Sequence, residues 1–299
     1  MKEVYTFGDL QDWRESGGAD EPPIRLSVLG DPVAHSKSPQ MHNAALRACG
    51  LAAGYARLQI HPSELERAVP LLMRNDFIGT NVTIPHKAAM LGLMDEVDEH
   101  ARKIGAVNTV VIRDGKLRGY NTDGPGIVRA LRAEFGVELR DLRVLILGAG
   151  GGAGRAIAVQ CALEQCERLV LTNRTFAKAR LLADELAPYF ETPRVTAVPP
   201  DLETLRAQLP HIDLVINASA SGMQNTDPSP LPAAVLPQHL LIYDTIYGAH
   251  RTALLRAADE AGIRSANGLS MLLHQGALSF EIWFDRPAPI EQMRAALLA

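Results

Sequence analysis

The sequence predicts a two-domain α/β protein, with one domain built on a mixed sheet and the other on a parallel, doubly wound sheet. Three observations support this fold class. The chain has 299 residues, enough for two domains of ordinary size. Short apolar strands alternate with helical stretches along most of its length, which is typical of βαβ units. A glycine-rich turn at residues 148–154 lies between an apolar strand and a helix, as at the start of a nucleotide-binding sheet.

The composition narrows the class of protein. Hydrophobic residues make up 47% and charged residues 21%, a balance typical of globular proteins. A net charge of −4 and a pI near 6.1 provide no basic field, so we expect neither nucleic acid nor a membrane surface as partner. No stretch approaches the roughly 18 apolar residues of a membrane span, and the acidic leader at 1–23 does not resemble a signal peptide. We therefore expect a cytoplasmic protein.

Cysteine and histidine spacing predicts neither a disulfide framework nor a metal site. Cys49, Cys161 and Cys166 form no CxxC pair and no even set, so we interpret them as reduced thiols that act as small buried hydrophobes. The histidines show no HExxH or similar ligand spacing, so metal catalysis is not expected.

The first half of the chain alternates strands and helices and then changes pattern. A helix is expected to begin at Ser38-Pro39, where serine is a good cap and proline suits the first turn. Asp114-Gly115 between two apolar runs predicts a hairpin, which makes the first sheet mixed. The expected strands are 24–29, 55–60, 79–84, 107–112 and 116–120, and further helices are expected at 63–75 and 95–104.

The pattern of the second half predicts a parallel sheet followed by terminal helices. A helix from Gly124 to about Phe135 precedes expected strands at 142–147, 168–172, 194–198, 213–217 and 240–244, and the chain is helical again from Gly268. These last helices can return to the first domain. The predicted organisation is an N-terminal extension at 1–23, a substrate-binding domain at 24–123 and 268–299, and a nucleotide-binding domain at 124–267.

The glycine-rich turn is a candidate phosphate site. A strand before it and a helix after it are the conditions under which such a turn binds a dinucleotide. Glycine lets backbone N–H groups approach the pyrophosphate, and a helix N-terminus favours its negative charge. The alternative is a tight turn that binds nothing. The candidate residues are Gly148, Ala149, Gly150, Gly151, Gly152 and Ala153.

The end of the next strand indicates which dinucleotide would bind. NAD sites usually place a carboxylate about 20 residues after the turn, whereas this chain has Asn173, Arg174 and Thr175 there, with Lys178 one helical turn later. Guanidinium donors pair well with a 2′-phosphate, so we predict NADP as the cofactor. The alternative is that Arg174 is a solvated loop residue and Thr175 a helix cap.

Four segments of the first half place polar side chains in loops or at strand ends, at 30–39, 81–87, 105–109 and 119–123. Together they suit a small substrate with several hydroxyl groups and a carboxylate, because each polar atom buried on binding needs a partner. Each residue also has a structural interpretation. Ser38 and Asp123 can cap helices, Asn108 and Asn121 can close turns, and Lys87 can point into solvent.

In combination these segments resemble the shikimate dehydrogenase family. The motifs HSxSP, NVTxPxK, GAVNT, GxNTD, a GAGG turn, NRT and a GxxML…Q helix all occur in order from about residue 24 to the C-terminus. The resemblance implies a mixed-sheet substrate domain closed by the C-terminal helices and a Rossmann-like NADP-binding domain. It implies an oxidoreductase that reversibly reduces 3-dehydroshikimate to shikimate, a step towards chorismate and the aromatic amino acids.

The resemblance also implies roles for particular residues. Lys87 and Asp123 match the catalytic pair. The matching substrate-binding residues are Ser36, Ser38, Asn81, Thr83, Asn108, Tyr247 and Gln275. The matching NADP-binding residues are the turn residues 148–153, Asn173, Arg174, Thr175, Lys178, Thr245 and Gly268, and residues 217–222 resemble a loop near the nicotinamide.

Some features depart from the family pattern or leave alternatives open. The turn has one residue more before Arg155 than the common GAGGAxR form, Ala220 departs from the usual loop, and the leader has no assigned role. A quinate or quinate/shikimate dehydrogenase and a non-catalytic dinucleotide sensor are the rival functions. A carboxylate near Lys87 would favour its ammonium form, so Lys87 acts either as a general base or as a charged donor. We expect a monomer or a homodimer.

Overall fold

The computed structural model describes residues 2–16, 20–248 and 250–299, and it divides into two compact units. Unit 1 comprises Met1–Thr122 and Leu272–Ala299, and unit 2 comprises Asp123–Met271. The N-terminal residues, expected to form a separate extension, are instead part of unit 1, because they contribute a strand and several buried side chains to it. None of the helices in the described ranges is long and apolar enough to cross a membrane.

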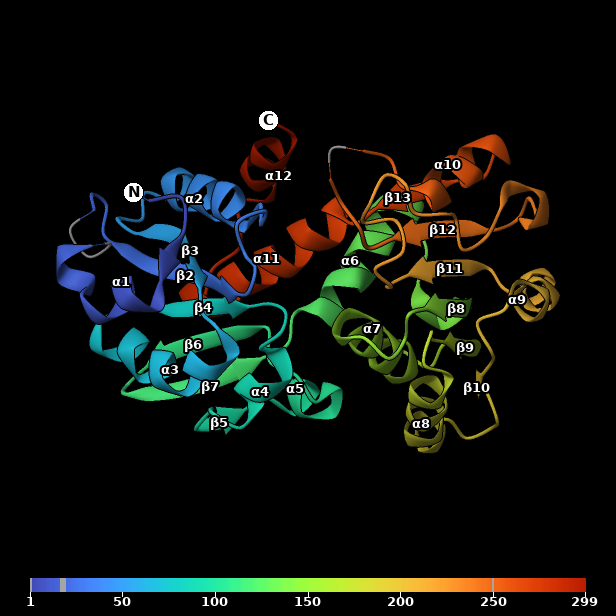
Figure 1. The fold of residues 1–299 in the computed structure, drawn as a ribbon, viewed down its shortest axis with the longest axis horizontal. Helices are drawn as coiled ribbons and strands as arrows, with labels where there is room; N and C mark the ends of the chain where they lie inside the picture. Colours follow the sequence, from blue (N-terminus) through green and yellow to red (C-terminus); the bar gives the residue numbers. More distant parts are fainter. Residues whose placement is uncertain (1, 17–19, 249) are drawn as a thin grey trace. The chain divides into compact units, whose positions relative to one another are not determined.

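Unit 1 contains a seven-stranded sheet in the order β1-β3-β2-β4-β6-β7-β5 (Figure 1). Strands β4, β6 and β7 pair antiparallel, and the other pairings are parallel, which confirms the predicted mixed sheet. The strands are β1 (Tyr5–Thr6), β2 (Ile24–Gly30), β3 (Gly54–Gln59), β4 (Gly79–Val82), β5 (Glu96–Val97), β6 (Thr109–Arg113) and β7 (Lys116–Tyr120).

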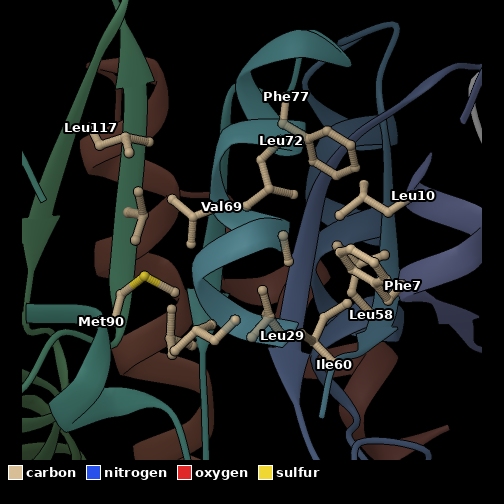
Figure 2. Packing of buried hydrophobic residues seen from close by; sticks show 14 of the residues in the cluster. Phe7, Leu10, Leu29, Leu58, Ile60, Val69, Leu72, Phe77, Met90 and Leu117 are labelled. Atoms are coloured by element: carbon tan, nitrogen blue, oxygen red, sulfur yellow. The ribbon is translucent and has the colours of Figure 1, made fainter. Parts of the chain in front are cut away.

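Apolar side chains from the helices and strands of unit 1 form a shared core. Figure 2 shows Val69 and Leu72 of one helix lying against side chains of the sheet, with Phe7 and Leu10 of the N-terminal helix beside them. The helices are α1 (Phe7–Gln11), α2 (Ser38–Ala48), α3 (Leu65–Arg74), α4 (Lys87–Leu91), α5 (Glu99–Ile104) and α12 (Ile290–Leu298), together with most of α11 (Leu269–Phe284).

Two helix predictions for unit 1 need correction. The helix expected at 95–104 begins only at Glu99, because the Asp98 side chain caps it by accepting from His100 N at 2.9 Å, and Glu96–Val97 pair with β7 as an edge strand. Ser38 is the first helical residue and not the cap. The N-cap position belongs to Lys37, which makes no side-chain capping bond. Ser38 is thus available for another role.

Unit 2 contains a six-stranded, entirely parallel sheet in the order β10-β9-β8-β11-β12-β13, which confirms the predicted doubly wound domain (Figure 1). Its strands are β8 (Arg143–Leu147), β9 (Arg168–Thr172), β10 (Val195–Ala197), β11 (Leu214–Asn217), β12 (Leu241–Asp244) and β13 (Ser265–Asn267). Its helices are α6 (Asp123–Phe135), α7 (Gly152–Leu163), α8 (Phe176–Leu186), α9 (Leu202–Gln208) and α10 (Ala253–Glu260).

The parallel strands of unit 2 bring several candidate residues to one edge of the sheet. In such a sheet the carboxyl ends of neighbouring strands share an edge, where ligands bind. Strands β8, β9, β11 and β12 are adjacent in the sheet order. The residues that follow them are Gly148, Asn173, Ala218 and Thr245.

Candidate active site

Two glycines of the 148–154 turn are required by the packing of the protein itself. Gly148 has φ +83°, and a Cβ there would lie 2.7 Å from Ser219. A Cβ on Gly154 would lie 2.3 Å from the carbonyl oxygen of Gly148. These glycines let the turn, the 217–222 loop and the start of α7 approach one another closely.

Gly152, the first residue of α7, is different. A Cβ added to it would meet nothing within 4 Å among the described residues, so the local packing does not require a glycine there. The first N–H groups of a helix have no acceptors within the helix, and the helix dipole favours an anion beside them. The lengthened turn therefore presents an open, donor-rich surface, and its backbone fits a dinucleotide pyrophosphate.

The predicted NADP-selecting residues lie beside this turn. Asn173 Oδ1 accepts from Gly150 N at 3.3 Å, and a Cβ on Gly150 would lie 2.8 Å from Lys178 Cβ. Arg174, Thr175 and Lys178 are exposed. Thr175 is at the N-cap position of α8 but makes no side-chain capping bond. The cluster thus offers two cationic side chains next to the turn, which suits an additional phosphate group.

A buried hydrogen-bond network fixes the 217–222 loop. Asn217 Oδ1 accepts from Ser219 N at 3.1 Å and from Ser219 Oγ at 2.7 Å. Asn217 Nδ2 donates to Ser221 O and to Asp244 Oδ1, both at 3.0 Å. Thr252 Oγ1 donates to Asp244 Oδ2 at 2.6 Å, and burial raises the pKa of the Asp244 carboxyl. Asp244 was not among the predicted site residues, although it ends the strand that leads to Thr245.

Thr245, Gly268 and Tyr247 are also part of unit 2. A Cβ on Gly268 would lie 2.0 Å from Thr245 O, and Gly268 N donates to Ile246 O at 3.1 Å. The backbones after β12 and β13 are therefore in close contact, and only glycine fits at 268. Tyr247 is partly buried, and this burial raises the pKa of its phenol.

In unit 1, Asn81 lies at the centre of a buried polar network. Its Oδ1 accepts from the Tyr55 hydroxyl at 2.8 Å, and its Nδ2 donates to Ser279 Oγ at 2.9 Å and to Thr109 Oγ1 at 3.1 Å. Thr109 Oγ1 and Ser279 Oγ are 2.8 Å apart. The network joins β3, β4, β6 and α11, so the orientation of the Asn81 amide is fixed by three other elements.

Asn108 connects this network to the residue before Asp123. Its Oδ1 accepts from Thr122 N at 2.8 Å and from Thr109 Oγ1 at 3.0 Å, while its Nδ2 donates to Thr122 Oγ1 at 3.0 Å. Asn121 Nδ2 donates to Ala106 O at 2.9 Å. Both asparagines therefore tie the GAVNT segment to the GxNTD segment, which the sequence alone did not show.

The turn that carries Lys87 is held at several points. Thr83 N donates to Leu29 O at 2.9 Å, and the Lys87 carbonyl accepts from Val107 N at 2.9 Å. The buried His86 ring donates through Nε2 to Ile60 O at 2.7 Å, and burial lowers the pKa of the ring. Lys87 itself begins α4 and is half-buried, in contrast to the interpretation that it points into solvent.

The remaining substrate candidates of unit 1 are two serines and a glutamine. Ser36 and Ser38 are buried, and Ser38 N donates to Ser36 Oγ at 3.3 Å. Gln275 is half-buried on α11, and its Nε2 donates to Leu272 O at 2.9 Å. Ser279, one turn further along, donates to Gln275 O at 3.0 Å. Ser279 was not among the predicted residues, because its contact with Asn81 depends on how α11 packs against the sheet.

The predicted residues divide between the two units. Unit 1 contains Ser36, Ser38, Asn81, Thr83, Lys87, Asn108 and Gln275. Unit 2 contains Tyr247, the turn and its basic neighbours, and Asp123, which is buried at the start of α6. A polar cluster in one α/β unit and a phosphate-type turn in the other define a class of protein, the two-domain dehydrogenases that pair a dinucleotide with a small polar substrate.

Comparison with known proteins identifies the family. Residues 28–110 match the shikimate dehydrogenase substrate binding domain, residues 130–235 match the shikimate/quinate 5-dehydrogenase family, and residues 268–298 match the shikimate 5′-dehydrogenase C-terminal domain. The NADP⁺-dependent shikimate dehydrogenase of Symbiobacterium thermophilum is 44% identical over 92% of this chain and 93% of its own. That of Methanopyrus kandleri is 42% identical over 91% and 94%. The chain belongs to the shikimate dehydrogenase family.

Solved structures support the same conclusion. A shikimate dehydrogenase in complex with NADP⁺ is 37% identical with a TM-score of 0.85, covering 91% of this chain and 94% of that one. The Thermus thermophilus shikimate 5-dehydrogenase in complex with NADP(H) and shikimate is 36% identical with a TM-score of 0.82, over 92% and 98%. A quinate dehydrogenase from Corynebacterium glutamicum in complex with NAD is 28% identical with a TM-score of 0.82, over 92% and 98%.

Proposed function

We propose that unit 1 binds 3-dehydroshikimate or shikimate, that unit 2 binds NADP(H), and that Lys87 and Asp123 form the catalytic pair. The chain is an NADP-dependent shikimate dehydrogenase of the shikimate pathway, an oxidoreductase that acts on a CH–OH group. One observation carries the assignment of residues. Asn81 and Asn108, both matched to the family by sequence, belong to one buried hydrogen-bonded network in unit 1.

The proposed substrate residues have the chemistry that a polyhydroxylated carboxylate requires. The hydroxyl groups of Ser36, Ser38 and Thr83 can donate and accept hydrogen bonds. The side-chain amides of Asn108 and Gln275 offer a donor NH₂ and an acceptor oxygen. A substrate hydroxyl buried without a partner costs binding free energy, so several such groups on a fixed scaffold give specificity. Ser36, Ser38 and Asn108 are each less than one-tenth exposed.

Lys87 is proposed to act as the charged donor. During reduction, negative charge develops on the ketone oxygen, and the Lys87 ammonium stabilises this charge and supplies the proton that makes the hydroxyl. The Asp123 carboxylate is proposed to accept a hydrogen bond from the substrate hydroxyl and to orient it. NADPH, when bound, supplies the hydride. In the oxidising direction the neutral Lys87 amine accepts the hydroxyl proton.

Arg174 and Lys178 are proposed to select NADP over NAD. Both are exposed, and Asn173 holds their segment against the turn. An arginine presents a planar set of donors that matches phosphate oxygens. The open position at Gly152 leaves room for the backbone to approach the pyrophosphate.

Steady-state absorbance at the NADPH band tests this function. We expect the highest kcat/KM for shikimate with NADP⁺, and lower values when quinate replaces shikimate or NAD⁺ replaces NADP⁺. A preference for quinate would instead support the quinate dehydrogenase alternative. Absence of turnover with both substrates, in a protein that still binds NADP⁺, would support a non-catalytic sensor.

The enzyme is further proposed to work in the cytoplasm as a monomer or a homodimer. Support for the compartment comes from three free cysteines, of which Cys161 and Cys166 are buried and Cys49 is partly exposed. Light scattering coupled to gel filtration would measure the mass, and a tetramer would contradict the proposal.

A further inference from the structure

We propose that Arg57 is a positioning residue for substrate binding, because it holds the Ser36–Ser38 segment in place and is itself braced by the N-terminal residues. The inference rests on the proposed function, in which Ser36 and Ser38 contact the substrate. Arg57 lies on β3, outside the motifs that relate the chain to its family.

The guanidinium of Arg57 binds the main chain between the two serines. Nε donates to Ser36 O at 3.0 Å and Nη2 donates to the same oxygen at 2.7 Å. Nη2 also lies 3.3 Å from Gln40 Oε1, in the first turn of α2. Hydrogen bonds from a charged donor are stronger than neutral ones, and two donors on one carbonyl fix its direction.

The orientation of this carbonyl determines where both serine hydroxyls lie. Ser36 N donates to Val33 O at 3.0 Å, and Ser38 N donates to Ser36 Oγ at 3.3 Å, so the loop is bonded on each side of the Ser36 carbonyl. Without Arg57, the peptide between residues 36 and 37 loses two charged hydrogen-bond donors and can rotate. Rotation would displace Ser36 and Ser38 without touching the reacting atoms.

The N-terminal segment supports the strand that carries Arg57. β1 pairs parallel with β3, with Tyr5 opposite Leu58 and Thr6 opposite Gln59. Glu3 O lies 3.4 Å from Arg57 Nη1, so a leader carbonyl accepts from the same guanidinium. β3 would otherwise expose an unpaired edge next to the substrate loop.

Buried contacts anchor this N-terminal segment to the turn between α3 and β4. The ring of Trp13 lies 5.0 Å from that of Phe77 and 5.2 Å from that of Tyr5. Asn75 Nδ2 donates to Leu10 O at 2.8 Å, and Leu10 and Trp13 are almost fully buried. The match to the family's substrate binding domain begins at residue 28, so the N-terminal residues of this brace lie outside the matched range.

The test uses full-length Arg57→Ala and Arg57→Lys variants in the shikimate oxidation assay. Arg57→Ala should raise the KM for shikimate about tenfold, the equivalent of one lost positioning interaction. Arg57→Lys should raise it less, because lysine keeps the charge but not the paired donors. The kcat and the KM for NADP⁺ should stay within about twofold of wild type, since Arg57 acts through the Ser36 carbonyl and has no proposed role in the chemistry or in cofactor binding.

Arg25→Ala is the matched control. Arg25 lies on the neighbouring strand β2 and also donates to main-chain carbonyls, those of Asn75 and Asp76, at 3.4 and 3.2 Å. The Arg25→Ala substitution should leave the KM for shikimate unchanged. Both tryptophans, Trp13 and Trp283, belong to unit 1, so tryptophan fluorescence reports whether unit 1 of each variant is folded.

The serine variants separate failure of this inference from failure of the proposed function. In a Ser36→Ala/Ser38→Ala background, which should itself raise the KM, Arg57→Ala should add little, because its effect passes through those residues. An unchanged KM for shikimate in both Arg57→Ala and Arg57→Lys would overturn the role of Arg57 and leave the proposed function intact. An equal rise of this KM in Arg25→Ala would do the same. An unchanged KM in the serine double variant would overturn their proposed substrate contact and the Arg57 role with it. Lack of wild-type turnover would overturn the proposed function itself.

Discussion

The candidate substrate residues of unit 1 and the candidate cofactor residues of unit 2 are held in opposite ways. Asn81 and Asn108 are each about 95% or more buried and make several side-chain hydrogen bonds across the sheet. Arg174, Thr175 and Lys178 are exposed, and the turn beside them is shaped mainly by glycine backbone. The substrate side is thus built from buried side chains, whereas the cofactor side is built from main chain and exposed charge.

This difference separates two routes to specificity. A buried network is ordered before the ligand arrives, so binding costs little further side-chain entropy. A change in its geometry leaves buried polar atoms without hydrogen-bond partners and therefore lowers the stability of the folded protein. An exposed cationic cluster tolerates substitution without loss of fold, and its contribution is screened by salt. Substitutions on the substrate side should therefore affect both binding and stability, while those on the cofactor side should change cofactor choice alone.

The largest expected effect is at Lys87, the one substrate-side residue with a proposed chemical role. Lys87→Met should lower kcat by about 10²- to 10⁴-fold, the usual range for a lost general acid or base. The KM for shikimate should change much less. Stopped-flow and steady-state rates at saturating substrate measure the effect, with tryptophan fluorescence as the control for folding of unit 1. A kcat near that of wild type would refute the catalytic role.

On the cofactor side, Arg174→Ala should raise the KM for NADP⁺ about 10- to 100-fold, because a charge-assisted pair of hydrogen bonds to phosphate is lost. The KM for NAD⁺, which lacks that phosphate, should stay within about twofold. Arg180→Ala, an exposed arginine on α8 that is not predicted to bind NADP, is the matched control. An equal rise in the KM for NADP⁺ and the KM for NAD⁺ would mean that Arg174 does not recognise the 2′-phosphate.

The buried network itself is tested at Ser279. Ser279→Ala leaves Asn81 Nδ2 and Thr109 Oγ1 short of a partner, so we expect the KM for shikimate to rise about tenfold together with a loss of about 1–3 kcal/mol of stability. Ser27→Ala removes a buried hydroxyl from a 2.7 Å pair with Thr80, one residue before Asn81, and should leave the KM unchanged. Urea unfolding and steady-state kinetics measure the two effects. A KM rise in Ser27→Ala equal to that in Ser279→Ala would contradict the special role of the network.

The smallest expected effect is a pH dependence of the stability of unit 1. Burial lowers the pKa of His42, which stacks on Tyr55 at 4.5 Å, to about 3. Between pH 6.5 and 3 the unfolded chain binds a proton there that the folded protein does not, so stability falls as the pH decreases through this range. From pH 6.5 to 5.5 the loss is about 1 kcal/mol for an unfolded pKa near 6.5.

His42→Phe should reduce this slope while keeping an aromatic ring in the stack. Urea unfolding followed by tryptophan fluorescence at several pH values provides the measurement, because both tryptophans lie in unit 1. Burial also lowers the pKa of His86, which should add to the slope in the same direction. An identical pH dependence in wild type and His42→Phe would show that His42 does not contribute.

Elements with a strong local pattern were predicted from the sequence. The strand at 168–172 has the bounds expected for it, and the helix expected after the glycine turn is present as α7, although it begins within the turn at Gly152. The strands β1, β5 and β13 were missed. They have only two or three residues, and such short strands are defined by the partner to which they pair rather than by their own apolar pattern.

The sequence by itself determined the two α/β domains, the dinucleotide turn and the identity of Lys87, Asp123 and Arg174 as candidates. Each of these is encoded by neighbouring residues, through strand and helix periodicity, glycine spacing or a short motif. Only the tertiary structure decided the roles of Ser279, Arg57 and the N-terminal residues. Ser279 reaches Asn81 across 198 positions of sequence, and Arg57 joins Ser36 to Glu3. Such contacts depend on strand pairing and helix docking, which no local pattern records.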